Sequence, residues 1–173
     1  YYTDWGSDTV KRIPAGGGAP TTLASATGLI YHRAMVVDDT HAYFGDEDGI
    51  KRVPKGGGAV TTLAPGYDSV MLAIDDTYLY WTEWKSVDPD AIRRVPKAGG
   101  AVDTIVSGGS LADPWGIAVD ASYVYWTELD GGRLRRVAKT GGSIVDLAPA
   151  GLDRQAGSIA VDDEDVYWTD TTG

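Results

Sequence analysis

The chain has no cysteine and no asparagine among its 173 residues. Without cysteine it has neither a disulfide framework nor a thiolate metal site, and such a chain is compatible with every redox compartment. Without asparagine it has no N-glycosylation sequon. This second absence argues against a eukaryotic cell-surface protein.

Histidine is scarce as well, since only His32 and His41 are present. The sequence has no His-Glu-x-x-His motif, no Gly-x-Ser-x-Gly elbow and no phosphate-binding loop. The run Asp46–Gly49 resembles part of a calcium loop but lacks the distal glutamate, so a hairpin turn explains it better. The sequence therefore predicts a protein that is not an enzyme and that has no cofactor and no bound metal.

Basic residues are in the minority, with 15 lysines and arginines against 25 aspartates and glutamates and a formal net charge of -10. Nucleic-acid binding needs a clustered basic surface, so nucleic acid is excluded as a partner. No apolar run approaches the length of a membrane span, so membrane insertion is not expected. Solubility explains the excess of acid, and attraction of cations or basic partners is the alternative.

Glycine, tryptophan and tyrosine are plentiful and recur in a pattern. The chain has 23 Gly, 6 Trp and 10 Tyr, a mix typical of short strands joined by tight turns. One aromatic segment occurs five times, with leading tyrosines 37 to 45 positions apart, which suits one four-stranded blade per repeat. The five segments are Tyr1–Asp4, Tyr43–Asp46, Tyr80–Glu83, Tyr125–Glu128 and Tyr167–Asp170.

Three other segments recur in phase with the aromatic one. We name the four expected strands A (apolar, ending in Asp), B (aromatic), C (basic) and D (threonine-rich). The basic strand occurs as Val10–Pro14, Ile50–Pro54, Ile92–Pro96 and Leu134–Ala138. Short segments bounded by turn residues are typical of strands, and no segment has an apolar period of 3.6, so no helix is expected.

The combination of these motifs resembles a known family. The aromatic segment after an Ile-Ala-Val-Asp strand, as in Ile117–Asp120 and Tyr125–Glu128, resembles the YWTD repeat of low-density-lipoprotein-receptor class B domains. The basic-Val-Pro-x-Gly-Gly segment is more similar to bacterial relatives of that domain. The resemblance covers the whole chain and implies an all-β fold, a β-propeller of four-stranded antiparallel blades. Phe44-Gly45 replaces Trp-Thr in one repeat, and the receptor's partners do not transfer.

The resemblance implies one YWTD-type propeller domain, or part of one, over residues 1–173. Three blades are complete and two are partial. Strands B, C and D occupy 1–24, the complete blades 31–64, 69–106 and 114–148, and a final A and B pair 157–170. Because six blades of about 42 residues need about 250 residues, we expect the ring to be completed by missing sequence or by another copy.

The repeated aromatic and charged residues have expected structural roles. We expect Trp81, Trp126 and Trp168 to fill the space between blades, and the tyrosines at 43, 80, 125 and 167 to place their hydroxyls on polar partners. The aspartates of the A–B turns are expected to bond to their own backbone. The arginines at 12, 52, 94 and 136 are expected to pair with the acidic residues at 4, 46, 83, 128 and 170.

Loop variation predicts where the chain binds a partner. The A–B and C–D turns are short and uniform, whereas the B–C and D–A loops, at the other end of each blade, differ from repeat to repeat. Variable loops on a rigid scaffold commonly carry recognition. The candidate binding residues at that end are Trp5, His32, Arg33, Tyr67, Asp68, Trp84, Asp113, Trp115, Arg154 and Gln155.

Three functions are compatible with the sequence. The first is a non-enzymatic binding module, bacterial and secreted, that presents the B–C and D–A face to a protein or glycan outside the cell, on the bacterial surface or in the periplasm. The second is an assembly subunit that self-associates or is completed by missing blades. The third is a propeller lyase or lactonase with a metal in the central channel, against which the lack of Asn and the scarcity of His both count.

Overall fold

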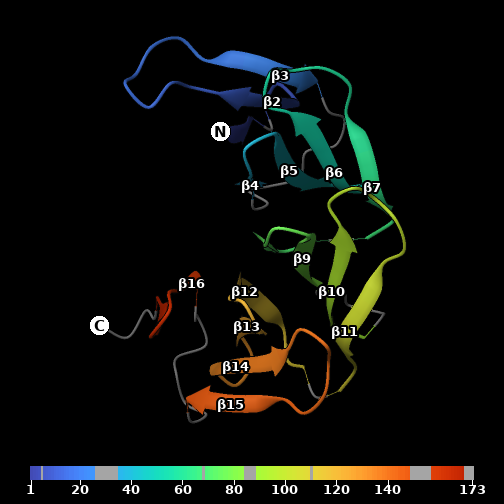
Figure 1. Cartoon of the computed structure of the whole chain (residues 1–173), viewed down its shortest axis with the longest axis vertical. Coiled ribbons are helices and arrows are strands. Elements are labelled where there is room, and N and C mark those ends of the chain that lie inside the picture. The colour runs from blue at the N-terminus through green and yellow to red at the C-terminus, as the bar shows by residue number, and fades with distance from the viewer. Residues whose placement is uncertain are drawn as a thin grey trace. The chain divides into compact units, whose positions relative to one another are not determined.

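The computed structural model describes residues 1–4, 6–25, 35–67, 69–83, 89–109, 111–148 and 157–169. In these ranges the secondary structure consists of antiparallel strands and turns, without helix (Figure 1). The chain forms two compact units, Tyr1–Ser69 and Val70–Gly173, which are described separately.

The first unit contains two sheets. A three-stranded sheet has the order β1-β2-β3, and a four-stranded sheet has the order β4-β5-β6-β7. The strands are β1 (Tyr2–Asp4), β2 (Thr9–Arg12), β3 (Thr21–Ser25), β4 (Met35–Val37), β5 (His41–Asp46), β6 (Gly49–Pro54) and β7 (Thr61–Pro65).

The second unit contains three sheets. Two are four-stranded, in the orders β8-β9-β10-β11 and β12-β13-β14-β15, and β16 and β17 form a two-stranded sheet. The strands are β8 (Leu72–Ile74), β9 (Tyr78–Glu83), β10 (Ala91–Pro96), β11 (Asp103–Ser107), β12 (Pro114–Val119), β13 (Tyr123–Glu128), β14 (Arg133–Ala138), β15 (Val145–Ala148), β16 (Ile159–Val161) and β17 (Val166–Trp168).

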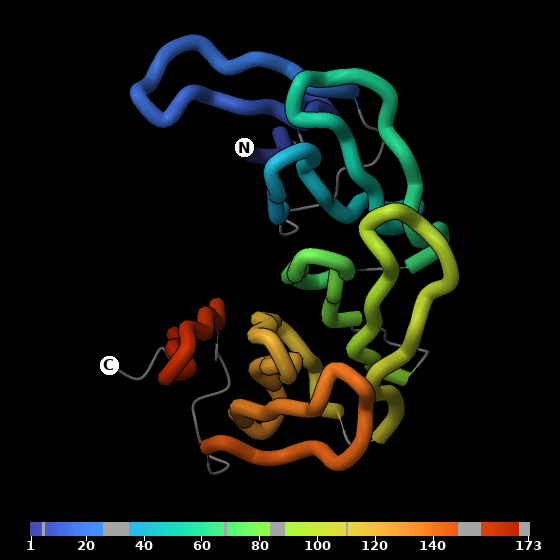
Figure 2. The backbone as a smooth tube through the Cα atoms, in the orientation of Figure 1, coloured from blue at the N-terminus to red at the C-terminus, as the bar shows by residue number. Residues whose placement is uncertain are grey.

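These sheets confirm the predicted fold class. Strands A to D of each repeat pair in sequence order, as in a propeller blade, and the described residues give three complete blades and two partial ones. Paired glycines make the C–D turns possible, because Gly57 and Gly58 have φ angles of 86° and 137°, which side-chain-bearing residues rarely adopt. Figure 2 follows the backbone through the equivalent turns of each complete blade.

Strand B residues pack between blades, as predicted for two of the three tryptophans. Trp81 and Trp126 are fully buried. Trp126 belongs to a core cluster with Tyr80 and Ile92 of the preceding blade. Trp168, at the same repeat position, is 37% exposed, so the prediction that it fills the space between blades is wrong. The reason lies in its two-stranded sheet, where β17 pairs with β16 alone.

Candidate functional site

The A–B turns have the same hydrogen bonding in all four described copies. In each turn the aspartate Oδ1 atom accepts two backbone N–H groups, at 2.8 and 2.8 Å for Asp38 and at 2.8 and 2.7 Å for Asp75. The Oδ2 atom accepts the hydroxyl of the strand B tyrosine, at 2.8 Å from Tyr43 and from Tyr80. Asp120 and Asp162 repeat the pattern. Both predictions for these residues are confirmed, and the carboxylates serve the turn.

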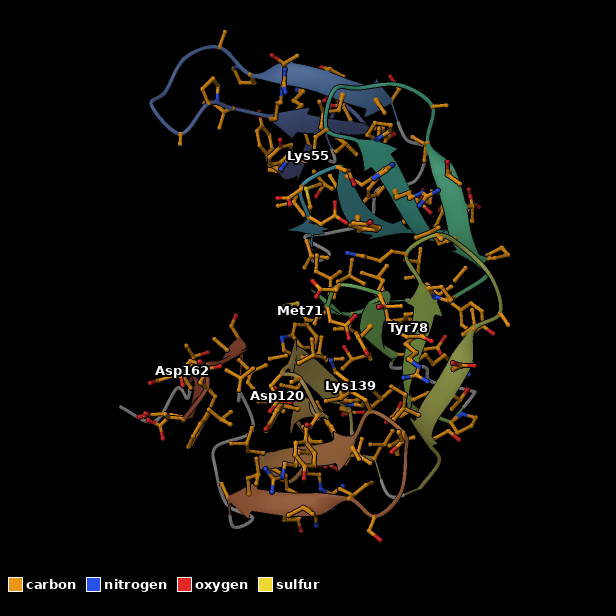
Figure 3. All side chains as sticks on the ribbon, in the orientation of Figure 1. Lys55, Met71, Tyr78, Asp120, Lys139 and Asp162 are labelled. Carbon is orange, nitrogen blue, oxygen red and sulfur yellow. The ribbon has the colours of Figure 1, made fainter. Side chains whose placement is uncertain are left out.

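One of these carboxylates also joins two blades. Lys139 Nζ, from the C–D turn of the next blade, lies 2.6 Å from Asp75 Oδ2, and Figure 3 labels Lys139 beside the equivalent turn residue Asp120. Burial opposes ionisation of Asp75, but hydrogen bonds from Lys139, from the Tyr78 N–H and from the Tyr80 hydroxyl outweigh it and lower its pKa to about 2. Burial and the same carboxylate raise the pKa of Tyr80.

Asp75→Asn is expected to make stability less dependent on pH. Because the pKa of Asp75 falls from 3.8 to about 2 on folding, the carboxylate stabilises the fold above pH 4 and loses that effect as the pH falls toward 2. Solvent partly screens this pair, in which the Asp75 side chain is 25% exposed, so we expect the variant to lose about 1–2 kcal/mol at pH 7. Urea unfolding at a series of pH values should show the difference shrinking in acid. The exposed neighbour gives the control, since Asp76→Asn should leave the pH profile unchanged; a constant difference for Asp75→Asn would contradict the assignment.

The carboxylates at the end of strand B pair with a different basic residue from the one predicted. Lys11 contacts Asp4, Lys51 contacts Asp46 and Arg93 contacts Glu83, each at 2.5 Å, and Arg135 contacts Glu128 at 3.0 Å. The prediction that Arg12, Arg52, Arg94 and Arg136 pair with these carboxylates is therefore wrong. The register explains the error, because Glu83 shares a sheet face with Trp81, and Trp81 lies opposite Arg93 rather than Arg94.

The second basic residue of strand C has another role. Arg94 Nη1 donates to the Lys139 carbonyl at 3.0 Å, and its guanidinium carbon lies 4.4 Å from the centre of the Tyr78 ring. Arg12 Nη1 donates to the Lys55 carbonyl at 3.1 Å. Each of these bonds reaches the C–D turn of the next blade, so this arginine ties neighbouring blades together.

Three of the strand B carboxylates that form these ion pairs are fully buried. Asp46, Glu83 and Glu128 have no exposed surface. Burial raises the pKa of Glu128, although its Oε1 atom accepts hydrogen bonds from Trp126 Nε1 at 3.1 Å and from Arg135 Nη1 at 3.0 Å. Arg135 also binds Asp146 at 2.6 Å, which extends the network to the outermost strand. These buried acids therefore brace the blade from inside.

The B–C and D–A end differs from blade to blade. The B–C connections span 5–8, 47–48, 84–90 and 129–132, and the D–A connections span 26–34, 66–71, 108–113 and 149–158. The A–B connections by contrast span 38–40, 75–77, 120–122 and 162–165. The C–D connections, at the same end as the A–B connections, span 13–20, 55–60, 97–102 and 139–144. Loop length therefore varies more at the B–C and D–A end than at the other end.

Asp113 is held rigidly at this end. Its N–H donates to Asp90 Oδ2 at 3.0 Å, its carbonyl accepts the Leu129 N–H at 3.0 Å, and its φ of 52° lies in the left-handed region that residues with side chains rarely occupy. The Asp90 carbonyl accepts the Gly108 N–H at 3.1 Å. Hydrogen bonds to the Asp90 side chain and to the Leu129 backbone, which belong to two other loops, thus fix the backbone of this half-buried residue.

Trp115, two residues after Asp113, is the second residue of strand β12. Its carbonyl accepts the Thr82 hydroxyl of the preceding blade at 2.7 Å, while its side chain is half-buried. The next residue, Gly116, donates its N–H to Thr127 Oγ1 at 3.0 Å. The backbone around Trp115 is therefore clamped between two blades.

The two threonines were not recognised from the sequence. Thr82 Oγ1 accepts the Met71 N–H at 3.1 Å and donates to the Trp115 carbonyl; Thr127 Oγ1 accepts from Gly116 and donates to the Gly157 carbonyl at 3.1 Å. Each hydroxyl joins strand A of its own blade to that of the next. The sequence did contain a signal for this role, because threonine recurs at the third position of the aromatic motif.

Of the remaining candidate residues, Tyr67 alone lies within the described ranges. Tyr67 is half-buried and belongs to the first unit. Seven candidates lie outside the described residues: Trp5, His32, Arg33, Asp68, Trp84, Arg154 and Gln155. Within the described residues, no group of three or more His, Cys, Asp or Glu side chains is placed to hold a metal. No helix in these ranges is long and apolar enough to cross a membrane.

Comparison with known proteins shows similarity of fold. No protein-family model matches the sequence, and no curated protein matches it. A chain in a crystal structure of a nidogen/laminin complex is 16% identical with a TM-score of 0.66, over 95% of this chain and 82% of that one. A protein of unknown function from Bacteroides thetaiotaomicron is 18% identical with a TM-score of 0.68, over 86% and 40%. A putative TolB from Agrobacterium tumefaciens is 17% identical with a TM-score of 0.68, over 95% and 66%.

The chain therefore spans two fifths of the Bacteroides protein and just under two thirds of the Agrobacterium protein. The TM-scores of 0.66 to 0.68 show a shared fold, and that fold agrees with the blades that the repeats predicted.

Proposed function

We propose, starting from the YWTD-type β-propeller fold of this chain, that it is a non-enzymatic binding module whose recognition surface lies at the B–C and D–A end of its blades. The observation that carries this proposal is the contrast between the two ends. Four aspartate turns repeat one structure at one end, whereas the connections at the other end range from the two residues 47–48 to the ten residues 149–158. Variable loops on a rigid scaffold commonly carry recognition, and the uniform end has no such loops.

Asp113 and Trp115 are the proposed centre of that surface within the second unit. Their backbone is fixed by Asp90, Leu129 and Thr82, so binding would not have to order it. A half-buried tryptophan offers a large apolar area, and a nearby carboxylate adds polar selectivity. This chemistry suits a protein or a glycan, and the similarity in fold to a chain from a nidogen/laminin complex supports a protein.

We test this surface by comparing variants at the two ends of the blades. Trp115→Ala should weaken binding about tenfold or more, because a central aromatic residue commonly contributes over 1.4 kcal/mol. Asp76→Ala, at the uniform end of the neighbouring blade, should bind like the unchanged chain. The probes are a defined glycan array and immobilised laminin. If a probe binds the chain and both variants equally, the surface is wrong; if none binds, the proposed partner classes are wrong.

The proposed module works outside the cell or in the bacterial periplasm, and residues 1–173 act in it as one domain. The third function suggested by the sequence, a lyase or lactonase with a channel metal, makes a different prediction. Metal analysis of the purified chain distinguishes them, because a tightly held stoichiometric ion would favour the enzyme.

A further inference from the structure

One repeat position at the loop end of the blades carries a different kind of side chain in every copy. The position lies five residues before the aspartate of each A–B turn and is occupied by Arg33, Val70, Trp115 or Gly157. By contrast, the position two residues further along is apolar each time, with Met35, Leu72, Ile117 and Ile159. Packing therefore constrains the second position, whereas the first is available for recognition.

A buried threonine hydroxyl holds this position from the preceding blade. Thr82, on strand β9, is fully buried, and its Oγ1 atom lies 2.7 Å from the Trp115 carbonyl oxygen. The same atom accepts the Met71 N–H at 3.1 Å. Because an N–H group can only donate, the single hydroxyl proton of Thr82 is directed to the Trp115 carbonyl. Thr127, also fully buried, makes the corresponding bond to the Gly157 carbonyl at 3.1 Å.

The peptide group that joins Trp115 to Gly116 is held at both of its ends. Its carbonyl accepts the Thr82 hydroxyl, and its N–H donates to Thr127 Oγ1 at 3.0 Å. A peptide group is planar, so two hydrogen bonds from different blades fix its rotation. On the other side of Trp115, the ring of Pro114 fixes a further backbone angle. The direction in which the half-buried Trp115 side chain leaves the strand is therefore set by its neighbours.

We infer that Thr82 is a positioning residue of the proposed recognition surface, and that its buried hydroxyl sets the direction of Trp115 on the next blade. The inference rests on the proposed function and deepens it, because it assigns control of the site to a residue with no exposed surface. Loss of the hydroxyl would leave the Met71 N–H and the Trp115 carbonyl without this partner, so the peptide group would turn toward other partners. The recognition site is thus a product of two adjacent blades.

Thr82→Val tests the inference, because valine is also β-branched and lacks only the hydroxyl. Labelling the chain with fluorotryptophan gives each tryptophan a fluorine NMR signal, and Trp115→Phe identifies the signal of Trp115. This signal should move or broaden in Thr82→Val and should return to its place in Thr82→Ser, which restores the hydroxyl. The measurement needs no ligand.

Binding gives the second readout, with immobilised laminin and the defined glycan array as probes. Thr82→Val should weaken binding about fivefold or more. In a chain that carries Trp115→Ala, the same change should have no further effect, because Thr82 acts through Trp115. Lys139→Met is the matched control, since it removes the 2.6 Å bond to Asp75 that joins the same two blades at their other end. It should change neither the Trp115 signal nor the affinity.

Other outcomes overturn the inference. An unchanged Trp115 signal in Thr82→Val would show that the hydroxyl does not position this residue, whether or not a probe binds. Equal effects of Thr82→Val and Lys139→Met would show a general loosening between the blades instead. Failure of the proposed function looks different: Trp115→Ala then binds like the unchanged chain, or no probe binds, and the fluorine signal still decides the role of Thr82. Circular dichroism checks folding, and Thr82→Ala replaces a valine variant that unfolds.

Discussion

Trp126→Ala is expected to lower the free energy of unfolding by about 3–5 kcal/mol, the range found when a large buried aromatic side chain is truncated. Trp126 is fully buried and packs against Tyr80 and Ile92 of the preceding blade. The change also removes the donor that Trp126 Nε1 provides to Glu128 at 3.1 Å, in a place that water does not reach. Urea unfolding followed by far-ultraviolet circular dichroism measures the loss without relying on tryptophan fluorescence.

Trp168→Ala is the matched control, because Trp168 has the same repeat position and is 37% exposed. Partial burial in a two-stranded sheet leaves less apolar surface to lose, so we expect a cost of about 1–2 kcal/mol. Equal losses in the two variants would show that packing between blades is not what stabilises the second unit.

The strands could be predicted from the sequence because each level of the pattern indicates the same structure. Aromatic and β-branched residues in 4–6-residue runs favour strands, and the glycine pairs that follow Pro54 and Pro96 permit turns with positive φ. The in-phase recurrence of these runs then leaves an antiparallel blade as the simplest arrangement. The aspartate turns were predictable for a similar reason, since they are local and involve residues up to five positions apart.

The ion pairs could not be assigned without the strand register. The sequence shows two adjacent basic residues in strand C, and a shift of one position moves a side chain to the other face. Pairing of Trp81 with Arg93 puts Arg93 beside Glu83 and sends Arg94 toward the next blade. Motif recurrence alone does not distinguish these two positions.

The sequence predicted both an end of the blades and ten candidate residues there, of which Tyr67, Asp113 and Trp115 lie within the described ranges. The strand bounds confirm the variation in loop length, and the structure shows how Asp113 and Trp115 are fixed. The bridging roles of Thr82 and Thr127 depend on contacts between blades, which are distant in sequence. A repeated threonine in a strand is also expected from β propensity alone, so its signal was easily overlooked.

Gly116→Ala is expected to destabilise the second unit and to disturb the proposed site together. A Cβ atom at Gly116 would lie 2.4 Å from the Gly157 carbonyl oxygen and 3.0 Å from Thr127 Oγ1, so strands β12 and β16 must separate. Overpacking of this kind costs about 1–3 kcal/mol, and here it also strains the two hydrogen bonds of the Thr127 hydroxyl. Urea unfolding measures the loss, and a fall in the binding attributed to Trp115 should accompany it.

Gly109→Ala separates the steric effect from the general effect of replacing glycine. Gly109 is exposed, and a Cβ atom there would meet nothing within 4 Å. Alanine restricts the unfolded chain, so this control is expected to change stability by less than about 1 kcal/mol and in the favourable direction. If Gly116→Ala is as well tolerated as Gly109→Ala, the close approach of neighbouring inner strands is not a requirement of the fold, and the clamp around Trp115 loses its physical basis.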